Sequence, residues 1–178
     1  MKNIANWDYF EILKYCVIIP TYNNEKTLSR VIDGILKQDC RIKPIVVNDG
    51  STDGTLEILT AYKGQIELIS YDENQGKGKA LRQGFKRAIE LGYDNAITID
   101  SDGQHFPVDI PNMLKVASVN PGAVIMGSRN MNQEGVPSKS SFGNKFSNFW
   151  FRVETFIKLP DTQTGFRFYP LRPISKMR

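Results

Sequence analysis

Cysteine, histidine and long apolar runs are all scarce in this sequence. Two cysteines and one histidine occur among 178 residues, too few for a disulfide framework or a paired-cysteine metal motif. No apolar run approaches the roughly 20 residues of a membrane-spanning helix, and residues 1–15 lack the apolar core of a secretory signal. These absences favour a soluble domain in a cytoplasmic setting, with Cys16 as a buried, reduced thiol.

Charge is distributed unevenly along the chain. Residues 1–128 carry 14 Lys/Arg and 16 Asp/Glu, a net of −2, whereas residues 129–178 carry nine basic and three acidic residues, a net of +6. A basic C-terminal third indicates an anionic partner such as a phosphate, an acidic lipid surface or nucleic acid. A solvated basic face explains the same composition, so charge alone does not choose between them.

Short apolar segments alternate with helical patterns along the chain. Buried strands are predicted at 16–19, 44–47, 66–70, 96–99 and 123–126, and Pro20 is expected to stop the first. Apolar residues recur at helical spacing in 28–36, 56–59 and 81–89. This order predicts an α/β fold in a single domain, with a mostly parallel central sheet and helices on both faces.

Polar clusters follow three of the predicted strands, at 21–24, 48–53 and 100–105. In parallel α/β sheets ligands bind at the carboxyl ends of the strands, so we expect a binding site there. Asp100 and Asp102 can converge on one point at a strand end, and their hard oxygen ligands suit Mg²⁺ or Mn²⁺. The alternative is a polar turn in which Asp102 bonds to the backbone.

Two further segments have features of a nucleotide site. Residues 75–78 precede a predicted helix, and their two glycines allow close approach of an anion to its N-terminus, although the spacing of a P-loop is absent. Asp49 is placed to bond a base or ribose, and Tyr22 with Asn24 suits stacking on a base and contact with its edge. Each segment also fits an ordinary turn.

The segment 161–167 offers a second set of charged groups. Asp161 is a candidate base or acceptor-orienting residue, and Arg167 a candidate phosphate ligand. A surface turn with a local ion pair is the alternative. His105, the only histidine, is either a ligand or phosphate contact or, as is commoner beside a proline turn, a structural residue.

Four stretches, in this order and at this spacing, resemble the inverting glycosyltransferases of family 2, which have the GT-A fold. They are Val17 to Asn24, Val46 to Thr55, Asn74 to Gly78 and Ile99 to His105. The later segments 102–105, 127–129 and 161–167 are most similar to polyprenyl-phosphate sugar synthases, of which dolichol-phosphate mannose synthase is the familiar type. The resemblance covers residues 15–170.

The resemblance implies transfer of a sugar, with inversion, from a UDP- or GDP-linked donor to a sugar or polyprenyl-phosphate acceptor, with Mg²⁺ or Mn²⁺. The implied donor contacts are Pro20, Tyr22, Asn24, Asp49, Lys77, Gly78, Asp100 and Ser101. The implied metal ligands are Asp100, Asp102 and Gln104. The implied contacts of an acceptor phosphate are Arg129, Lys139 and Ser141, and Arg129 joins Asp161 and Arg167 in the predicted catalytic set.

The chain departs from the family pattern in two places. Asn48 stands where many members carry a second aspartate, so that part of the nucleotide pocket is expected to differ. Relatives usually continue with further helices beyond the position of Arg178, so we expect residues 1–178 to form one catalytic domain that is shortened at its C-terminal side. The aromatic segment 142–159, predicted to be helical, is expected either to lie on the inner face of the membrane or to pack on the sheet.

Two other functions compete with sugar transfer. A sugar nucleotidyltransferase shares the fold class and the metal carboxylates, but usually has a glycine- and arginine-rich loop at the position of residues 20–24. A non-catalytic nucleotide- or nucleic-acid-binding module would use the basic C-terminal third, but leaves Asp100 and Asp102 without a role. We therefore expect a transferase with no nucleic-acid partner.

Overall fold

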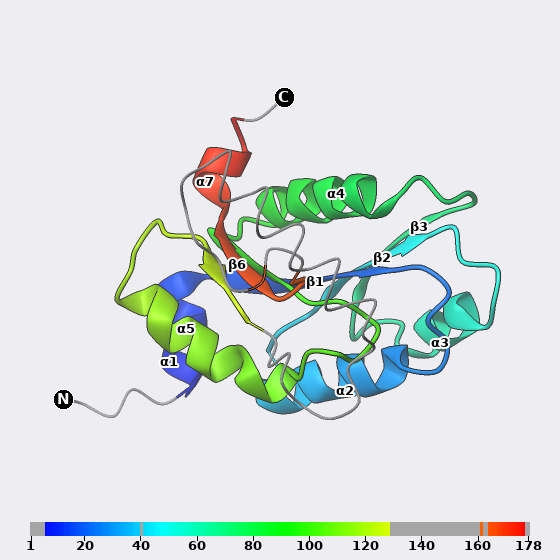
Figure 1. Ribbon diagram of the computed structural model, residues 1–178, viewed down its shortest axis with the longest axis horizontal. Coiled ribbons are helices and arrows are strands. Elements are labelled where there is room, and N and C mark those ends of the chain that lie inside the picture. The colour runs from blue at the N-terminus through cyan, green and yellow to red at the C-terminus, as the bar shows by residue number, and fades with distance from the viewer. Residues whose placement is uncertain (1–5, 40, 129–160, 162–163, 177–178) are drawn as a thin grey trace.

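The structure is a computed structural model that describes residues 6–39, 41–128, 161 and 164–176. The elements follow the chain in the order α1 (Asn6–Leu13), β1 (Tyr15–Thr21), α2 (Leu28–Gln38), β2 (Ile45–Asp49), α3 (Thr55–Ala61), β3 (Glu67–Tyr71), α4 (Lys77–Glu90), β4 (Asn95–Thr98), the 3₁₀ turn η1 (Pro107–Asp109), α5 (Ile110–Ser118), β5 (Ile125–Met126), β6 (Arg167–Pro170) and α7 (Leu171–Ile174). Figure 1 shows a central sheet between α4 on one face and α1, α2, α3 and α5 on the other.

The sheet has six strands in the order β3-β2-β1-β4-β6-β5. Strands β1 to β4 are parallel, and β6 is antiparallel to both of its neighbours, β4 and β5. This arrangement confirms the predicted α/β class with a mostly parallel sheet covered on both faces. Because β1, β2 and β4 run in the same direction, their carboxyl ends meet at one edge.

Alternate residues of the central strands pack into two separate cores. In β1, Val17 and Ile19 pack on the side of α2 and α5, whereas Cys16 and Ile18 pack on the side of α4. All four are fully buried, and burying an Ile or Val side chain contributes about 1.5–3 kcal/mol to folding. Cys16 is a free and buried cysteine, as expected, and burial raises the pKa of its thiol.

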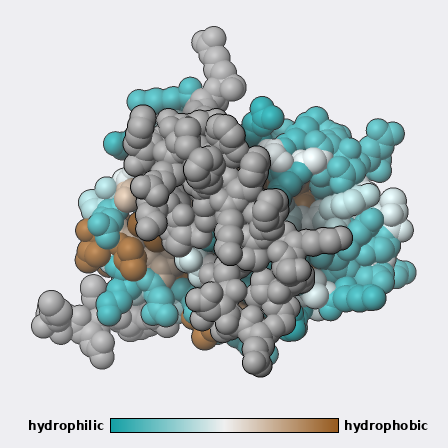
Figure 2. Space-filling view, viewed as in Figure 1, coloured by the Kyte–Doolittle hydropathy of each residue, from teal (hydrophilic) through white to brown (hydrophobic). Residues whose placement is uncertain are grey.

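Helix α2 packs on the sheet through one apolar face. Leu28, Val31, Ile32 and Ile35 are buried, and their spacing of three and four residues places them on one face of the helix. Where described residues are visible in Figure 2, their surface is largely hydrophilic, and hydrophobic residues gather on the side of α1 and α5, where Ile12, Val116 and Val119 are exposed. Within the described ranges no helix combines the length and hydropathy needed to cross a membrane.

Several boundaries differ from those predicted. Strand β1 does not stop at Pro20 but continues to Thr21, pairing with β2 there, while its pairing with β4 ends at Ile18. Proline is accommodated because its missing N–H falls beyond the last paired residue on the β4 side. The strand predicted at 123–126 is shorter, Ile125–Met126, and the segment with Arg167 forms β6 rather than a surface turn.

Candidate active site

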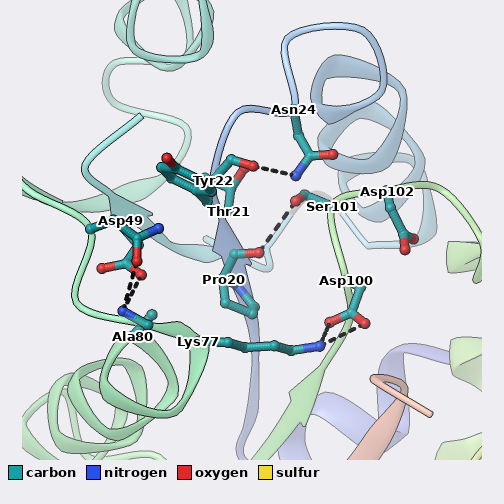
Figure 3. Close-up of a pocket in the computed structure, with 12 residues that line it drawn as sticks. Pro20, Thr21, Tyr22, Asn24, Asp49, Lys77, Ala80, Asp100, Ser101 and Asp102 are labelled. Atoms are coloured by element: carbon teal, nitrogen blue, oxygen red, sulfur yellow. Dashed lines mark hydrogen bonds and ion pairs between the residues drawn. The ribbon is translucent and has the colours of Figure 1, made fainter. Parts of the chain in front are cut away.

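Polar residues from the carboxyl ends of β1, β2 and β4, together with the N-terminus of α4, line a pocket of about 280 Å³. We call it the strand-end pocket. Its lining residues are Pro20, Thr21, Tyr22, Asn24, Asp49, Asn74, Gly76, Lys77, Ala80, Asp100, Ser101 and Asp102. Figure 3 shows Asp49 on one side of this pocket and Asp100 and Asp102 on the other.

The strand-end pocket brings together most of the residues expected to contact a donor. Of the predicted donor contacts, only Gly78 lies outside the lining, although Lys77, next to it, is inside. Of the predicted metal ligands, Asp100 and Asp102 line the pocket and Gln104 does not. The roles of all these residues stay predictions; the structure brings together those that line the pocket, and Gly78 and Gln104 lie outside its lining.

Asp100 is held between a lysine and a glycine. The Nζ of Lys77, the first residue of α4, lies 2.6 Å from Oδ1 and 2.8 Å from Oδ2 of Asp100. On another side, Asp100 lies so close to Gly165 that a side chain at position 165 would overlap its carboxylate. The Thr98 hydroxyl donates to the Gly165 carbonyl at 2.8 Å, so the segment before β6 fixes one wall around Asp100.

Asp102 belongs to a turn that Ser101 anchors. The Ser101 hydroxyl donates to the Pro20 carbonyl at 3.3 Å, and the Ser101 carbonyl accepts from the Thr27 hydroxyl at 2.6 Å. Asp102 Oδ1 accepts from the backbone N–H of Gln104 at 2.9 Å, as the polar-turn alternative expects. Because Ser101 is buried between them, the two aspartates are presented to the pocket from a fixed turn (Figure 3).

The donor set at this turn fits a hard divalent cation. The described part of the chain has no cluster of three or more His, Cys, Asp or Glu side chains arranged for an ion. Mg²⁺, however, usually binds through one or two carboxylates and completes its coordination with water and substrate phosphate. Asp100 and Asp102 therefore suit a cation that binds together with a phosphorylated ligand.

Asp49 organises the loop that leads into α4. Its Oδ1 accepts from the backbone N–H of Gln75 at 2.9 Å, and its Oδ2 accepts from that of Gly76 at 2.8 Å. Asp49 is 2% exposed. The pKa of neighbouring Tyr71 is raised by the burial of its own hydroxyl and by the charge of Asp49. Gly50, at φ +70°, has no room for a side chain against the backbone of Glu73, so this loop packs directly on the end of β2.

Replacing Asp49 with asparagine should destabilise the protein and weaken donor binding. The asparagine NH₂ group would face the backbone N–H of Gln75 or Gly76, so that two donors meet and one hydrogen bond is lost. A hydrogen bond to a charged acceptor contributes about 1.5–3 kcal/mol. We expect the free energy of unfolding in urea to fall by about 1–3 kcal/mol, and the dissociation constant of UDP, measured by calorimetry, to rise. Asp72→Asn, at an exposed position of the same loop, is the matched control; an equal effect there would contradict the assignment.

The turn after β1 is tied to the turn after β2. The Asn23 backbone N–H donates to the Ser51 hydroxyl at 3.0 Å, and the Thr52 backbone N–H donates to Asn23 Oδ1 at 2.8 Å. The Asn24 side-chain amide donates to the Tyr22 carbonyl at 2.9 Å. These bonds hold Tyr22 at the pocket rim with 44% of its surface exposed, where its ring is accessible to a flat ligand.

The segment before β6 makes structural contacts that the sequence did not reveal. His105 Nε2 lies 3.2 Å from the Thr164 hydroxyl, and the His105 ring stacks on Phe166 with centroids 5.6 Å apart. Arg167 donates to the Thr164 carbonyl at 2.8 Å and to the Tyr169 hydroxyl at 3.2 Å. These contacts favour the structural interpretation of His105. Asp161 is 2% exposed and does not line the strand-end pocket.

Some predictions fall on residues outside the described ranges. These are Arg129, Lys139, Ser141 and the aromatic segment 142–159. Sequence reasoning assigned no role to Gly165, which lies against Asp100, or to Thr164, which contacts His105. The glycine between Thr164 and Phe166 was the available signal, but its contacts with β4 bridge residues 67 positions apart in the sequence.

A mostly parallel α/β domain with a polar pocket at its strand ends, two aspartates following β4 and a lysine at the start of α4 is the arrangement expected of a GT-A nucleotide-sugar-dependent transferase. The family model for glycosyl transferase family 2 matches residues 16–177. The chain therefore belongs to glycosyl transferase family 2, whose members are enzymes.

Two similar proteins are named as transferases to lipid phosphates. The UDP-N-acetylglucosamine–dolichyl-phosphate N-acetylglucosaminyltransferase of Methanococcus voltae is 30% identical, over 85% of this chain and 67% of its own length. The undecaprenyl-phosphate mannosyltransferase of Micrococcus luteus is 28% identical, over 88% of this chain and 66% of its own length. The chain thus spans about two thirds of the length of these relatives.

Solved structures share the fold at low sequence identity. Glucosyl-3-phosphoglycerate synthase from Mycobacterium tuberculosis, in complex with phosphoglyceric acid, superposes with a TM-score of 0.75 at 18% identity, covering 99% of this chain and 65% of that chain. TarS residues 1–349 from S. aureus, in complex with UDP, superposes with a TM-score of 0.62 at 22% identity, covering 90% of this chain and 48% of that chain. These likenesses show the GT-A fold.

Proposed function

We propose that this protein transfers a sugar from a nucleoside-diphosphate sugar to a polyprenyl phosphate, with inversion at the anomeric carbon and with Mg²⁺ or Mn²⁺ as cofactor. The observation that carries the proposal is the strand-end pocket, in which Asp100 and Asp102 share one cavity with Asp49 and Lys77. Membership of glycosyl transferase family 2 supports the reaction class.

In the proposed donor complex, each wall of the pocket has a separate task. The exposed Tyr22 ring stacks on the base. Asp49 holds the Gln75 and Gly76 amides, and thereby sets the N-terminus of α4 beside the diphosphate, where the helix dipole and free N–H groups favour an anion. Lys77, at that N-terminus, supplies a positive charge to the same group.

The proposed ligands of the divalent cation are Asp100, Asp102 and Gln104. A cation bound there supplies charge neutralisation to the diphosphate as it departs. Ser101 holds the turn through its bonds to Pro20 and Thr27, so the two carboxylates are oriented before a ligand arrives. This pre-orientation reduces the reorganisation needed during the reaction.

The transfer itself is a single displacement. An oxygen of the acceptor phosphate forms a bond to the anomeric carbon, and the bond from that carbon to the diphosphate breaks, leaving its electron pair on the departing oxygen. A phosphate monoester oxygen is already ionised near neutral pH, because its second pKa is about 6, so no base is required. A hydroxyl acceptor would need a base, and Asp161 is the proposed residue in that case.

Two observations support a lipid phosphate as the acceptor. The named relatives are transferases to dolichyl or undecaprenyl phosphate, and residues 129–178 of this chain have a net charge of +6. Arg129, Lys139 and Ser141 lie in this basic third and are the proposed acceptor contacts. An acceptor of this kind resides in a membrane, so the enzyme would work in peripheral contact with the cytoplasmic face.

Transfer assays with a panel of UDP- and GDP-sugars test the proposal. We expect radiolabelled sugar to move to undecaprenyl phosphate with Mn²⁺ or Mg²⁺, and the transfer to stop when EDTA removes the cation. Asp161→Asn should leave transfer to the phosphate within about threefold, because no proton must be abstracted. Undecaprenol, which lacks the phosphate, is the matched acceptor control; no transfer from any donor, or equal transfer to the alcohol, would overturn the proposal.

A further inference from the structure

The Asp100 carboxylate has two candidate cationic partners, the Lys77 ammonium group and the proposed divalent cation. Both of its oxygens already lie within 2.8 Å of Lys77 Nζ, and the same carboxylate is a proposed ligand of the divalent cation. Gly165 closes another side, so the carboxylate has little freedom to turn toward a second partner. The ammonium group and a divalent cation therefore cannot both use Asp100 fully.

Lys77, in contrast, has an alternative partner within reach. Its side chain is 53% exposed, against 21% for that of Asp100, and a lysine stem has four flexible carbons. It starts α4 and lines the strand-end pocket, on the side to which a donor diphosphate is assigned. Exposed ion pairs contribute only about 0–1 kcal/mol, so a diphosphate with at least two negative charges competes well for the ammonium group.

We propose that Lys77 and the divalent cation compete for Asp100, and that a donor diphosphate draws Lys77 away, so that donor and cation bind cooperatively. The inference rests on the proposed function and adds a coupling to it. Lys77 is then more than a diphosphate contact: it weakens cation binding in the absence of donor and strengthens donor binding in the presence of cation. Linkage requires the donor to tighten cation binding by the same factor as the cation tightens donor binding.

Mn²⁺ binding to the purified chain, followed by the electron paramagnetic resonance signal of the free ion, measures this coupling without any turnover. For the wild type we expect saturating UDP to tighten Mn²⁺ binding by at least tenfold. For Lys77→Met we expect Mn²⁺ alone to bind about tenfold tighter than to the wild type, because the ammonium group that competes for Asp100 is removed. The enhancement by UDP should shrink by the same factor.

Three variants accompany that measurement. Lys77→Arg retains the charge and should behave as the wild type, and Lys79→Met removes an exposed lysine of the same helix that does not line the pocket and should change nothing. Lys77→Gln repeats the test with a polar side chain, so that the test can still be made if one of the two variants folds poorly. If Lys77→Met and Lys77→Gln bind Mn²⁺ no more tightly than the wild type, the competition is refuted while the proposed function stands. If the wild type binds no Mn²⁺ even with UDP or GDP present, both fail.

Discussion

Replacing Asp102 with alanine should reduce kcat for sugar transfer by roughly 10²–10³-fold, the scale on which a lost transition-state charge stabiliser acts. Asp102 is exposed at the pocket rim and accepts a hydrogen bond from the backbone N–H of Gln104, so the fold should survive its replacement. Unlike Asp100, it is not bonded to Lys77, and its removal leaves no lysine without its partner. Steady-state kinetics with saturating Mn²⁺ measure the effect.

The matched control for this variant is Asp94→Ala. Asp94 is also exposed but precedes β4, at the opposite end of the strand from Asp100 and Asp102. Transfer should stay within about twofold of the wild type, since surface substitutions away from special features change stability by less than about 0.5 kcal/mol. If the Asp102 variant were as active as the Asp94 variant, the cation would not be held where we place it.

Replacing Gly165 with alanine should lower both Mn²⁺ affinity in the presence of UDP and kcat/KM by roughly 10–100-fold, because a misplacement of about 1 Å in a reacting site can cost that much. The new Cβ would overlap the Asp100 carboxylate and displace it from the turn. The backbone itself should tolerate alanine, since Gly165 is not among the glycines with positive φ. Calorimetry and initial-rate kinetics are the measurements.

A double-mutant cycle separates this steric effect from general damage. Once Asp100 is alanine, the Cβ at position 165 has no carboxylate to displace, so Gly165→Ala should add almost nothing to the effect of Asp100→Ala. Residues in direct contact are expected to be non-additive in this way. Full additivity of the two substitutions would mean that Gly165 acts through the fold of β6 and not through Asp100.

The location of the candidate site was predictable because it follows from chain direction. Three apolar strands, each followed by a polar cluster, predict that residues 21–24, 48–53 and 100–105 meet at one edge, and the strand-end pocket contains residues from all three. The alternation of Cys16 to Ile19 between two cores is likewise a local property of a strand. Periodicity and parallel order therefore fixed the sheet and the position of the pocket.

What the sequence could not supply were contacts between distant segments. Nothing in residues 167–170 predicts an antiparallel strand, because Arg-Phe-Tyr-Pro lacks a continuous apolar pattern and its partner β4 lies far back in the chain. The Lys77–Asp100 ion pair joins residues 23 positions apart through the packing of α4 on β1 and β2. The assignment of Asp49 to the Gln75 and Gly76 amides depends on the same packing.

The position of β6 has a consequence for how the protein is made. Strand β6 lies between β4 and β5, yet it follows both in the chain, so β5 has no place in the sheet until residues 167–170 have emerged from the ribosome. Until then the edge of β4 is unpaired, and an unpaired strand edge is a template for association with other chains. Pairing strands so far apart in the sequence is also slow. Since Gly165 directly precedes β6, a nascent chain completes the wall beside Asp100 only after residues 167–170 have been synthesised.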